Sequence, residues 1–170
     1  MDIKNKIIVV TGAGAGIGKA LAICFAKQGA RRVICSDIDA IKSKETADMI
    51  DGFSIEADVS NEDDLINLIA QSEAEIGPID LFCSNAGILH QTGLDTSDQE
   101  WLRVWETNVM SHIWVARHLV PTMIARGGGY LLQTASAAGL LNQIGSAPYG
   151  VSKHAAIGFA EWLAFTYGDQ

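Results

Sequence analysis

Short apolar runs alternate with segments of helical periodicity along the whole chain, and this alternation restricts the fold more than any other feature. Between the runs, apolar residues recur at helical spacing, and several of the runs are almost continuously apolar. Strands of that kind are typical of a parallel sheet that is covered by helices on both faces. The sequence therefore predicts an α/β fold with a doubly wound parallel sheet, in one domain over residues 1–170. The expected strands are 6–11, 32–37, 53–57, 79–83 and 130–134.

Capping signals indicate where several of the helices begin and end. Ser60–Asp63 and Ser97–Glu100 each have the spacing of a capping box, so each predicts a helix start. The second of these helices is expected to run unbroken toward Arg126, after which three glycines end it. Pro148 suits the first turn of a last helix, which is expected to extend to about Tyr167.

Charge and composition exclude several classes of protein. Twenty acidic and twelve basic residues give a net charge of −8, so no nucleic-acid partner is expected. The apolar runs are far shorter than the ~18 residues of a membrane span, and the N-terminus lacks the apolar core of a signal peptide. The three cysteines lie in apolar runs without C-x-x-C spacing, which is typical of free thiols in a reducing compartment. We therefore expect a cytoplasmic protein that contacts no membrane.

A glycine-rich turn follows the first strand directly and opens the first helix. Its glycines fit the spacing G-x-x-x-G-x-G, with Gly12, Gly16 and Gly18 at the three places. Small residues let a ligand approach the backbone, and the helix N-terminus offers N–H groups to a phosphate. No Walker lysine follows, which argues against a nucleoside triphosphatase. The turn predicts a pyrophosphate site, and the alternative is a tight turn that only packs.

Asp37 ends the second strand, nineteen residues after Gly18. In dinucleotide-binding folds, an acidic residue at about that distance binds the 2′-hydroxyl of the adenine ribose. Its charge would repel the additional phosphate of NADP, and neither Ile38 nor Asp39 supplies a compensating basic group. The sequence therefore predicts NAD as the cofactor and disfavours NADP.

Tyr149 and Lys153 are four residues apart at the start of the last expected helix, so their side chains share a face. A nearby ammonium group and a helix N-terminus both stabilise a phenolate. The pair is therefore suited to moving a proton to or from an alcohol oxygen. The alternative is an aromatic side chain that packs at a helix start, with the lysine stem lying along it.

Together these motifs resemble the classical short-chain dehydrogenase/reductase family over the whole chain. After the glycine turn, the matching elements are Asp58-Val59, Ser84-Asn85-Ala86-Gly87, Asn108-Val109, Ser136 and Tyr149-Gly150-Val151-Ser152-Lys153. Ser84 stands where the family usually has asparagine, which is a small departure. The resemblance implies a Rossmann-type sheet and an oxidoreductase that transfers hydride between NAD(H) and a secondary alcohol or ketone.

The resemblance also implies roles for individual residues. Tyr149 is expected to be the acid/base, and Ser136 to hydrogen-bond the substrate oxygen. Lys153 is expected to stabilise the tyrosinate and hold the nicotinamide ribose, while Asn108 positions a water in the proton relay. The expected cofactor-binding residues are Thr11, Gly12, Gly14, Gly16, Ile17, Gly18, Asp37, Ile38, Asp58, Val59, Asn85, Ala86, Gly87, Tyr149 and Lys153. The expected substrate-binding residues are Ser136, Ala138 and Tyr149, and no metal site is expected.

Other interpretations stay open at this point. Ser136 would also serve to satisfy a strand-end backbone group, and Asn108, inside an apolar helix, would also serve as a structural hydrogen-bonding group. A catalytically silent nucleotide-binding module, or a truncated and inactive fragment of such an enzyme, would carry the same motifs. An epimerase or methyltransferase on a similar fold is disfavoured by the glycine spacing.

Substrate, partners and chain length are addressed less directly by the sequence. Leu140, Leu141 and Ile144 are expected to make the pocket mouth apolar, which favours a hydrophobic alcohol or ketone. Members of the family usually pair two long helices, so a homodimer or homotetramer is implied. A doubly wound dinucleotide fold usually has six strands in the order 3-2-1-4-5-6, whereas five are expected here. We therefore expect that the chain is an N-terminal portion of a longer enzyme, without the last strands and the substrate lid.

Overall fold

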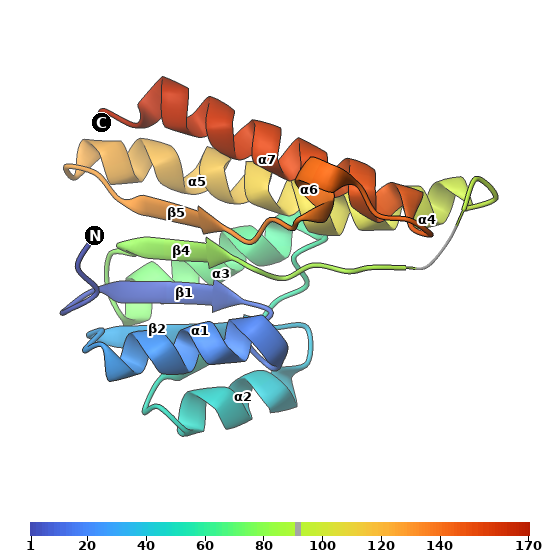
Figure 1. Cartoon of the computed structure of the whole chain (residues 1–170). Coiled ribbons are helices and arrows are strands. Elements are labelled where there is room, and N and C mark those ends of the chain that lie inside the picture. Colours follow the sequence, from blue (N-terminus) through green and yellow to red (C-terminus); the bar gives the residue numbers. More distant parts are fainter. Residues whose placement is uncertain (91–92) are drawn as a thin grey trace.

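Five parallel strands form the sheet in the computed structural model, which describes residues 1–90 and 93–170 (Figure 1). Their order is β3-β2-β1-β4-β5, and every neighbouring pair is parallel. This confirms the predicted α/β fold with a Rossmann-type doubly wound sheet, because the chain crosses from β3 over to β4 beside β1. The strands are β1 (Ile7–Thr11), β2 (Arg32–Asp37), β3 (Phe53–Glu56), β4 (Leu81–Ser84) and β5 (Tyr130–Gln133).

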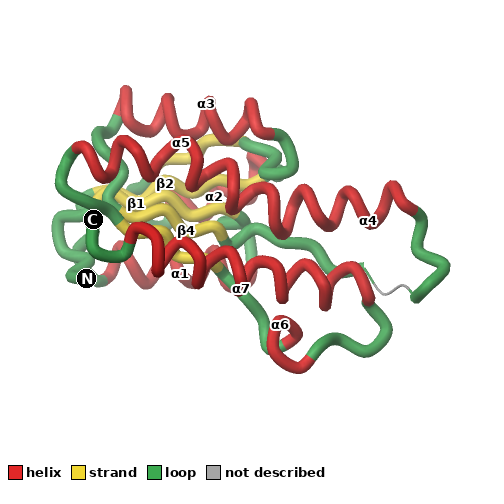
Figure 2. Tube along the Cα trace, turned by 90° about the horizontal axis from the view of Figure 1, so that it is seen from above, coloured by secondary structure: helices red, strands yellow, loops and turns green. Residues whose placement is uncertain are grey.

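Side chains of β1 alternate between the two faces of the sheet. Ile7 and Val9 belong to a core cluster with residues of the helices α3 (Glu62–Glu75) and α5 (Ser111–Ala125). Ile8 and Val10 pack with residues of α1 (Gly16–Lys27) and α2 (Ala40–Asp48). All four are buried, which explains why this strand is an unbroken apolar run in the sequence. Figure 2 shows the strands between α3 on one side and α1 on the other.

The helices lie close to the predicted segments, with one short addition, one shifted start and one interruption. The helix α6 was not expected, and it follows β5 directly. The helical elements are α1 (Gly16–Lys27), α2 (Ala40–Asp48), α3 (Glu62–Glu75), α4 (Asp98–Trp105), η1 (Glu106–Met110), α5 (Ser111–Ala125), α6 (Ala138–Leu141) and α7 (Ala147–Tyr167).

One of the two predicted capping boxes is confirmed and the other is wrong. The Ser97 side chain accepts from the Glu100 backbone N–H, and the Glu100 carboxylate accepts from the Ser97 backbone N–H, as expected. At α3 the capping residue is Asn61, whose side chain accepts from Asp63 N–H. The Asp63 N–H that a cap at Ser60 would bind is therefore taken by Asn61, and the Ser60 hydroxyl donates to Asp58 Oδ1 at 2.7 Å.

The long helix predicted after residue 97 is interrupted by a π-helical segment, η1. Within this stretch Thr107 donates its hydroxyl to Arg103 O, and Ser111 donates its hydroxyl to Thr107 O, each at a carbonyl four residues back. Such back-bonding hydroxyls weaken the regular backbone pattern, and single π turns are frequent at functional sites. The interruption lies at Asn108, one of the predicted site residues.

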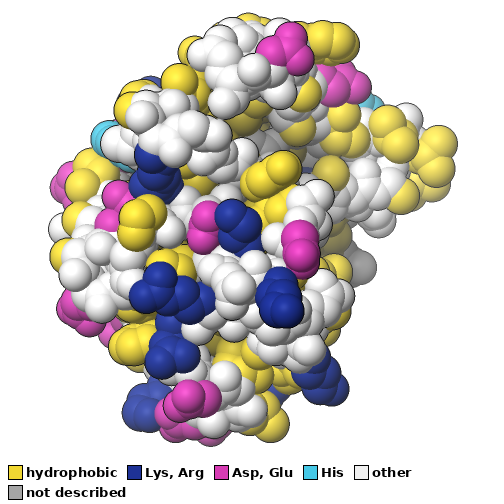
Figure 3. Space-filling view, turned by 90° about the vertical axis from the view of Figure 1, so that its left-hand side faces the viewer, with side chains coloured by type: hydrophobic (Ala, Val, Ile, Leu, Met, Phe, Trp, Pro, Cys, Tyr) yellow, Lys and Arg dark blue, Asp and Glu magenta, His cyan; other side chains and the backbone are white. Residues whose placement is uncertain are grey.

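The two ends of the sheet differ in character. Figure 3 looks onto the amino ends of the strands, where acidic and basic side chains are interspersed. The ion pairs Lys6–Asp80 and Arg126–Glu73, at 2.9 and 2.6 Å, lie at this end. At the edge of the sheet, β5 exposes about half of Tyr130 and Leu132, so one face of this strand is open. Among the described residues, no helix combines the length and the apolar character needed to cross a bilayer.

Candidate active site

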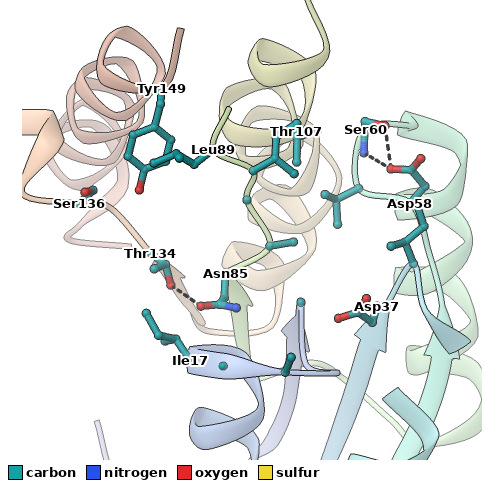
Figure 4. Close-up of a pocket in the computed structure, with 18 of the residues that line it drawn as sticks. Ile17, Asp37, Asp58, Ser60, Asn85, Leu89, Thr107, Thr134, Ser136 and Tyr149 are labelled. Atoms are coloured by element: carbon teal, nitrogen blue, oxygen red, sulfur yellow. Dashed lines mark hydrogen bonds between the residues drawn. The ribbon is translucent and has the colours of Figure 1, made fainter. Parts of the chain in front are cut away.

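A cleft of about 730 Å³ lies at the carboxyl ends of the strands (Figure 4). Ligands of open α/β sheets bind at this edge, next to the point where the strand order reverses. The volume is within the usual range for small-molecule and cofactor sites. The cleft is lined by Gly12, Ala15, Gly16, Ile17, Asp37, Ile38, Ala57, Asp58, Val59, Ser60, Asn85, Ala86, Gly87, Ile88, Leu89, Arg103, Thr107, Thr134, Ala135, Ser136, Tyr149 and Lys153.

The glycine turn forms the floor of the cleft at the start of α1. Gly16 has a φ of +52°, and apart from its chain neighbours and its own helix no atom of the described residues lies within 4 Å of where a Cβ would stand, so its backbone borders open space. A Cβ on Gly18 would collide with the carbonyl oxygen of Gly12, so the turn and the helix require that glycine. The first turn of α1 has no acidic side chain and no side-chain cap, which leaves its N–H groups available to an anion.

Asp37 is held at the end of β2 beside the glycine turn. Its Oδ2 accepts from Gly14 N–H at 2.9 Å, and its Oδ1 accepts from Asp39 N–H at 3.0 Å. Both bonds fix the carboxylate at the margin of the cleft, where Figure 4 shows it on the side away from Tyr149. A fixed acceptor next to a pyrophosphate-binding turn suits a ribose hydroxyl.

Thr11 and Asn85 connect the glycine turn to the loop after β4. The Thr11 hydroxyl accepts from the N–H groups of Asn85 and Ala86 at 3.0 and 3.1 Å, and it donates to Cys83 O. The Asn85 amide donates to Thr11 O at 3.0 Å and accepts from the Thr134 hydroxyl at 3.1 Å. These bonds hold the carboxyl ends of β1, β4 and β5 at fixed separations, so Thr11 supports the cleft from beneath without lining it.

Asp58, Val59 and Ser60 border the cleft on the side of β3. Asp58 Oδ1 accepts from both the N–H and the hydroxyl of Ser60, at 2.9 and 2.7 Å. The Asp58 N–H donates to Asp64 Oδ2, which joins this turn to the first turn of α3. The turn presents an apolar side chain, Val59, between two polar ones, which fits the edge of a flat aromatic ring such as an adenine.

At the other end of the cleft lie Ser136, Tyr149 and Lys153. Figure 4 shows the Tyr149 hydroxyl directed toward Ser136, with Leu89 beside the ring. Lys153 Nζ stands 5.7 Å from the centre of the Tyr149 ring, which is within the range of a cation–π contact. The three polar side chains therefore converge on one region, which is the requirement for proton transfer to a shared oxygen atom.

Lys153 is nearly buried, with 4% of its surface exposed. Its ammonium donates to Thr134 O at 2.9 Å, and the loss of hydration lowers the pKa of the lysine from its usual value. A buried ammonium with spare N–H groups stabilises negative charge more strongly than an exposed one, because less water screens it. The phenol oxygen of Tyr149 is the neighbouring group on which such charge would develop.

Asn108 lies behind the cleft in the π-helical segment and is fully buried. Its Oδ1 accepts from Ile88 N–H at 2.9 Å, and its Nδ2 donates to Ile88 O and to Ser152 Oγ at 2.9 and 3.0 Å. The carboxamide therefore fastens the loop after β4 to α7. This is the structural function considered above for Asn108, and a part in a proton relay stays a prediction.

Most of the predicted site residues come together in the cleft, and five do not line it. Thr11 and Asn108 support it from behind; Gly14 and Gly18 lie inside the turn, and Ala138 is buried at the start of α6. The lining residues that the sequence did not indicate are Ala15, Ala57, Ser60, Ile88, Leu89, Arg103, Thr107, Thr134 and Ala135. Ala15, Ser60, Ile88 and Ala135 were detectable as neighbours of predicted residues. Arg103 and Thr107 reach the cleft from a helix, and no spacing signal marks them.

The cleft therefore fits a dinucleotide along its length. The glycine turn and α1 would take the pyrophosphate, and Asp37 with Asp58 and Val59 would surround the adenosine half. Asn85-Ala86-Gly87 and Lys153 would contact the other half, next to Tyr149 and Ser136. Open space at Gly16 and the unpartnered amino end of α1 are the observations that favour a bound anion over a turn that only packs.

Several known proteins are similar in sequence to this chain. The profile described as "short chain dehydrogenase" matches residues 6–170. An uncharacterised oxidoreductase of Thermotoga maritima is 33% identical over 175 residues, which cover 99% of this chain and 68% of the relative. Mouse 17-beta-hydroxysteroid dehydrogenase 13 is 33% identical over 166 residues, covering 93% of this chain and 54% of the mouse protein.

A solved structure shows the same likeness in three dimensions. The short-chain dehydrogenase/reductase of Burkholderia phymatum, determined in complex with NAD, superposes with a TM-score of 0.94 at 28% identity. The match covers 99% of this chain and 62% of that one. The chain thus spans about half to two thirds of the length of these proteins.

Proposed function

Because this chain belongs to the short-chain dehydrogenase/reductase family, we propose that it carries the cofactor and proton-transfer sites of an NAD(H)-dependent oxidoreductase. The reaction is the interconversion of a secondary alcohol and a ketone. The observation that supports this most is the meeting of Ser136, Tyr149 and Lys153 at one end of a cleft whose other end is the glycine turn and Asp37. A nucleotide-binding module without chemistry would not require the three polar side chains to converge.

Proton transfer is the task of Tyr149. Its hydroxyl takes the proton from the alcohol in one direction and returns it to the ketone oxygen in the other. Ser136 hydrogen-bonds the same substrate oxygen, and its own Oγ is oriented by the Ala138 N–H, which donates to it at 3.1 Å. Lys153 stabilises the tyrosinate by its charge, and Thr134 O fixes the direction of the ammonium.

The nicotinamide cofactor, when bound, accepts or supplies the hydride. Within this chain, the amino end of α1 holds the pyrophosphate, and Asp37 accepts a hydrogen bond from the adenine ribose. The charge of Asp37 favours NAD over NADP, because the additional 2′-phosphate would stand against a carboxylate. Gly87 keeps the approach to Lys153 open, since a Cβ there would be 3.5 Å from Nζ and 3.2 Å from Asn108 Oδ1.

The substrate is a hydrophobic alcohol or ketone in this proposal. Leu89 lines the cleft, and Leu140, Leu141 and Ile144, in and after α6, are 73%, 83% and 100% exposed. Such large exposed apolar side chains near a reactive site favour an apolar ligand. The mouse relative is named for a hydroxysteroid, an alcohol of this chemical class.

Exposed apolar residues of α4 and α7 support the proposal of a homodimer or homotetramer. Leu102 and Trp105 on α4, with Trp162 and Phe165 on α7, expose between 36% and 91% of their surface. Tryptophan and phenylalanine are enriched in the centres of protein interfaces. Sedimentation of the purified chain would report the assembly.

The proposed function is tested by titrating the purified chain with NAD and then adding a panel of secondary alcohols. Binding is measured by calorimetry, and turnover by the near-ultraviolet absorbance of the NADH that forms. We expect NAD to bind and apolar secondary alcohols to give the highest rates. Binding without turnover on any alcohol would support a silent nucleotide-binding module. Failure to bind NAD would overturn the proposal.

A further inference from the structure

A lysine that does not line the cleft lies beside the carboxylate that would meet the adenine ribose. Lys42, on the first turn of α2, pairs its Nζ with Asp39 Oδ2 at 2.9 Å. Asp39 also caps the helix, because its Oδ1 accepts from Lys42 N–H at 3.1 Å. The sequence did not indicate Lys42, since it is five residues beyond Asp37 and no spacing rule links the two positions.

The fold brings this lysine over the glycine turn. A Cβ on Gly14 would be 2.8 Å from Lys42 Cβ and 3.0 Å from Asp37 Oδ2, so the three residues meet at one point. Gly14 N–H donates to that same carboxylate oxygen. The Asp37, Asp39 and Lys42 side chains therefore form one charged group beside the turn, which we name the ribose-side cluster.

The three side chains of the ribose-side cluster influence one another electrostatically. The hydrogen bond and the charge of Asp39 raise the pKa of Lys42, and the charge of Asp37 adds to this effect. Two carboxylates and one ammonium leave the cluster with a net charge of −1. A 2′-phosphate would carry further negative charge into this region, whereas a 2′-hydroxyl would not.

Resting on the proposed function, we infer that Asp39 is a second determinant of the preference for NAD over NADP. It acts by pairing with the ammonium of Lys42, whose stem lies beside Gly14 and Asp37. With Asp39 uncharged, Lys42 becomes available to a 2′-phosphate. Asp37 excludes the phosphate directly, and Asp39 withholds the group that would bind it.

The substitution Asp39→Asn separates charge from structure. Asparagine is as good a helix cap as aspartate, so α2 keeps its start while the carboxylate charge is removed. Lys44 provides the matched control, because it lies on the same helix and is paired with Asp48 at 2.7 Å. Lys42→Met and Lys44→Met therefore each remove one positive charge from α2. Lys42→Met removes it beside Gly14, and Lys44→Met removes it beside Asp48.

The experiment measures the dissociation constants of NADP and NAD by calorimetry for these variants, alone and with Asp37→Ser. We expect Asp39→Asn to tighten NADP binding about five-fold in either background, the effect of one exposed charge interaction. NAD binding should change less than about two-fold, since its ribose adds no charge there. When combined with Asp39→Asn, Lys42→Met should abolish the gain in NADP affinity, whereas Lys44→Met should leave that gain unchanged. Added salt should reduce the gain.

The outcomes separate this inference from the proposed function. If the parent chain binds NAD but Asp39→Asn binds NADP no more tightly than the parent does, the role of Asp39 is overturned. A gain that survives Lys42→Met would overturn the role of Lys42. Failure of the parent chain to bind NAD would overturn the proposed function and this inference with it. Thermal unfolding of each variant confirms that α2 is intact.

Discussion

His112 should make the fold sensitive to acid, and replacing it with leucine should remove that sensitivity. The side chain lies on the first turn of α5 and is 1% exposed. Neither ring nitrogen has a hydrogen-bond partner among the described residues, and the nearby Gln133 Oε1 has none either. The ring is therefore buried in its neutral form, and no acceptor among the described residues is aligned to hold a second proton.

The magnitude follows from the pKa of the ring. Burial, and then the charge of Lys153 on α7, lower the pKa of His112 from 6.5 to about 4, while the Gln133 amide opposes this weakly. Since Gln133 has no well-aligned contact with the ring, burial and charge dominate. Between these two pKa values the unfolded chain binds a proton that the folded chain does not, so stability falls as the pH falls from about 6.5 toward 4. From about pH 7 to about pH 5 the loss from this residue is about 2 kcal/mol.

Urea denaturation at several pH values between about 7 and 5 checks this expectation. Other groups also titrate in this range, so the relevant quantity is the difference in pH dependence between the parent and His112→Leu. Leucine has a similar volume and no titratable group, and the variant should lose about 2 kcal/mol less than the parent over the interval. His154→Leu, at an exposed position on α7, is measured in parallel as a control for the loss of a histidine. Parallel pH dependence of the parent and His112→Leu would show that His112 does not cause the acid sensitivity.

Three further expectations concern the turn, the loop after β4 and the thiols. Gly18→Ala should destabilise the fold by about 1–3 kcal/mol and weaken NAD binding, because the added methyl group collides with Gly12 O. Urea denaturation and NAD titration curves that match those of the parent would contradict this. Asn108→Leu should cost about 1–3 kcal/mol by leaving buried partners unpaired, and equal stability in urea would contradict this. A disulfide reagent should modify one thiol in the native chain and three in denaturant, and rapid modification of all three would contradict the burial of two. The exposed thiol is Cys24, and burial raises the pKa of Cys35 and Cys83 to about 12.

Much of the fold could be predicted because β1 and its neighbours are buried on both faces. An unbroken run such as Ile7–Thr11 is produced by a central parallel strand, and the glycine turn after it requires a sharp entry into a helix. The capping box at Ser97 depends only on local contacts, so its spacing was sufficient. At the start of α3, the Asn61 side chain rather than the Ser60 hydroxyl accepts from the Asp63 N–H, and Ser60 donates to Asp58. Competition between two local acceptors is not visible in a spacing rule.

The site could be predicted where function depends on a fixed local motif, and not where it depends on contacts between distant segments. Tyr149 and Lys153 are one helical turn apart, so their shared face follows from the sequence. Lys42 reaches the glycine turn only because α2 packs beside β2, and Arg103 reaches the cleft from another helix. No sequence signal marks His112, which lies in an apolar segment. Its burial, near Gln133 of β5 and Lys153 of α7, results from the fold. Such effects belong to packing and leave no periodic signal.

The turnover of Tyr149→Phe tests the proposed function most directly, when it is compared with that of the parent chain at matched NAD saturation and with the best alcohol of the panel. The phenol moves the proton and contributes little to holding the dinucleotide, so the rate should fall by about 10²–10⁴ while the NAD dissociation constant stays within about two-fold. A variant that turns over at the rate of the parent would contradict the assignment of Tyr149 as the acid/base and, with it, the proposed function of this cleft.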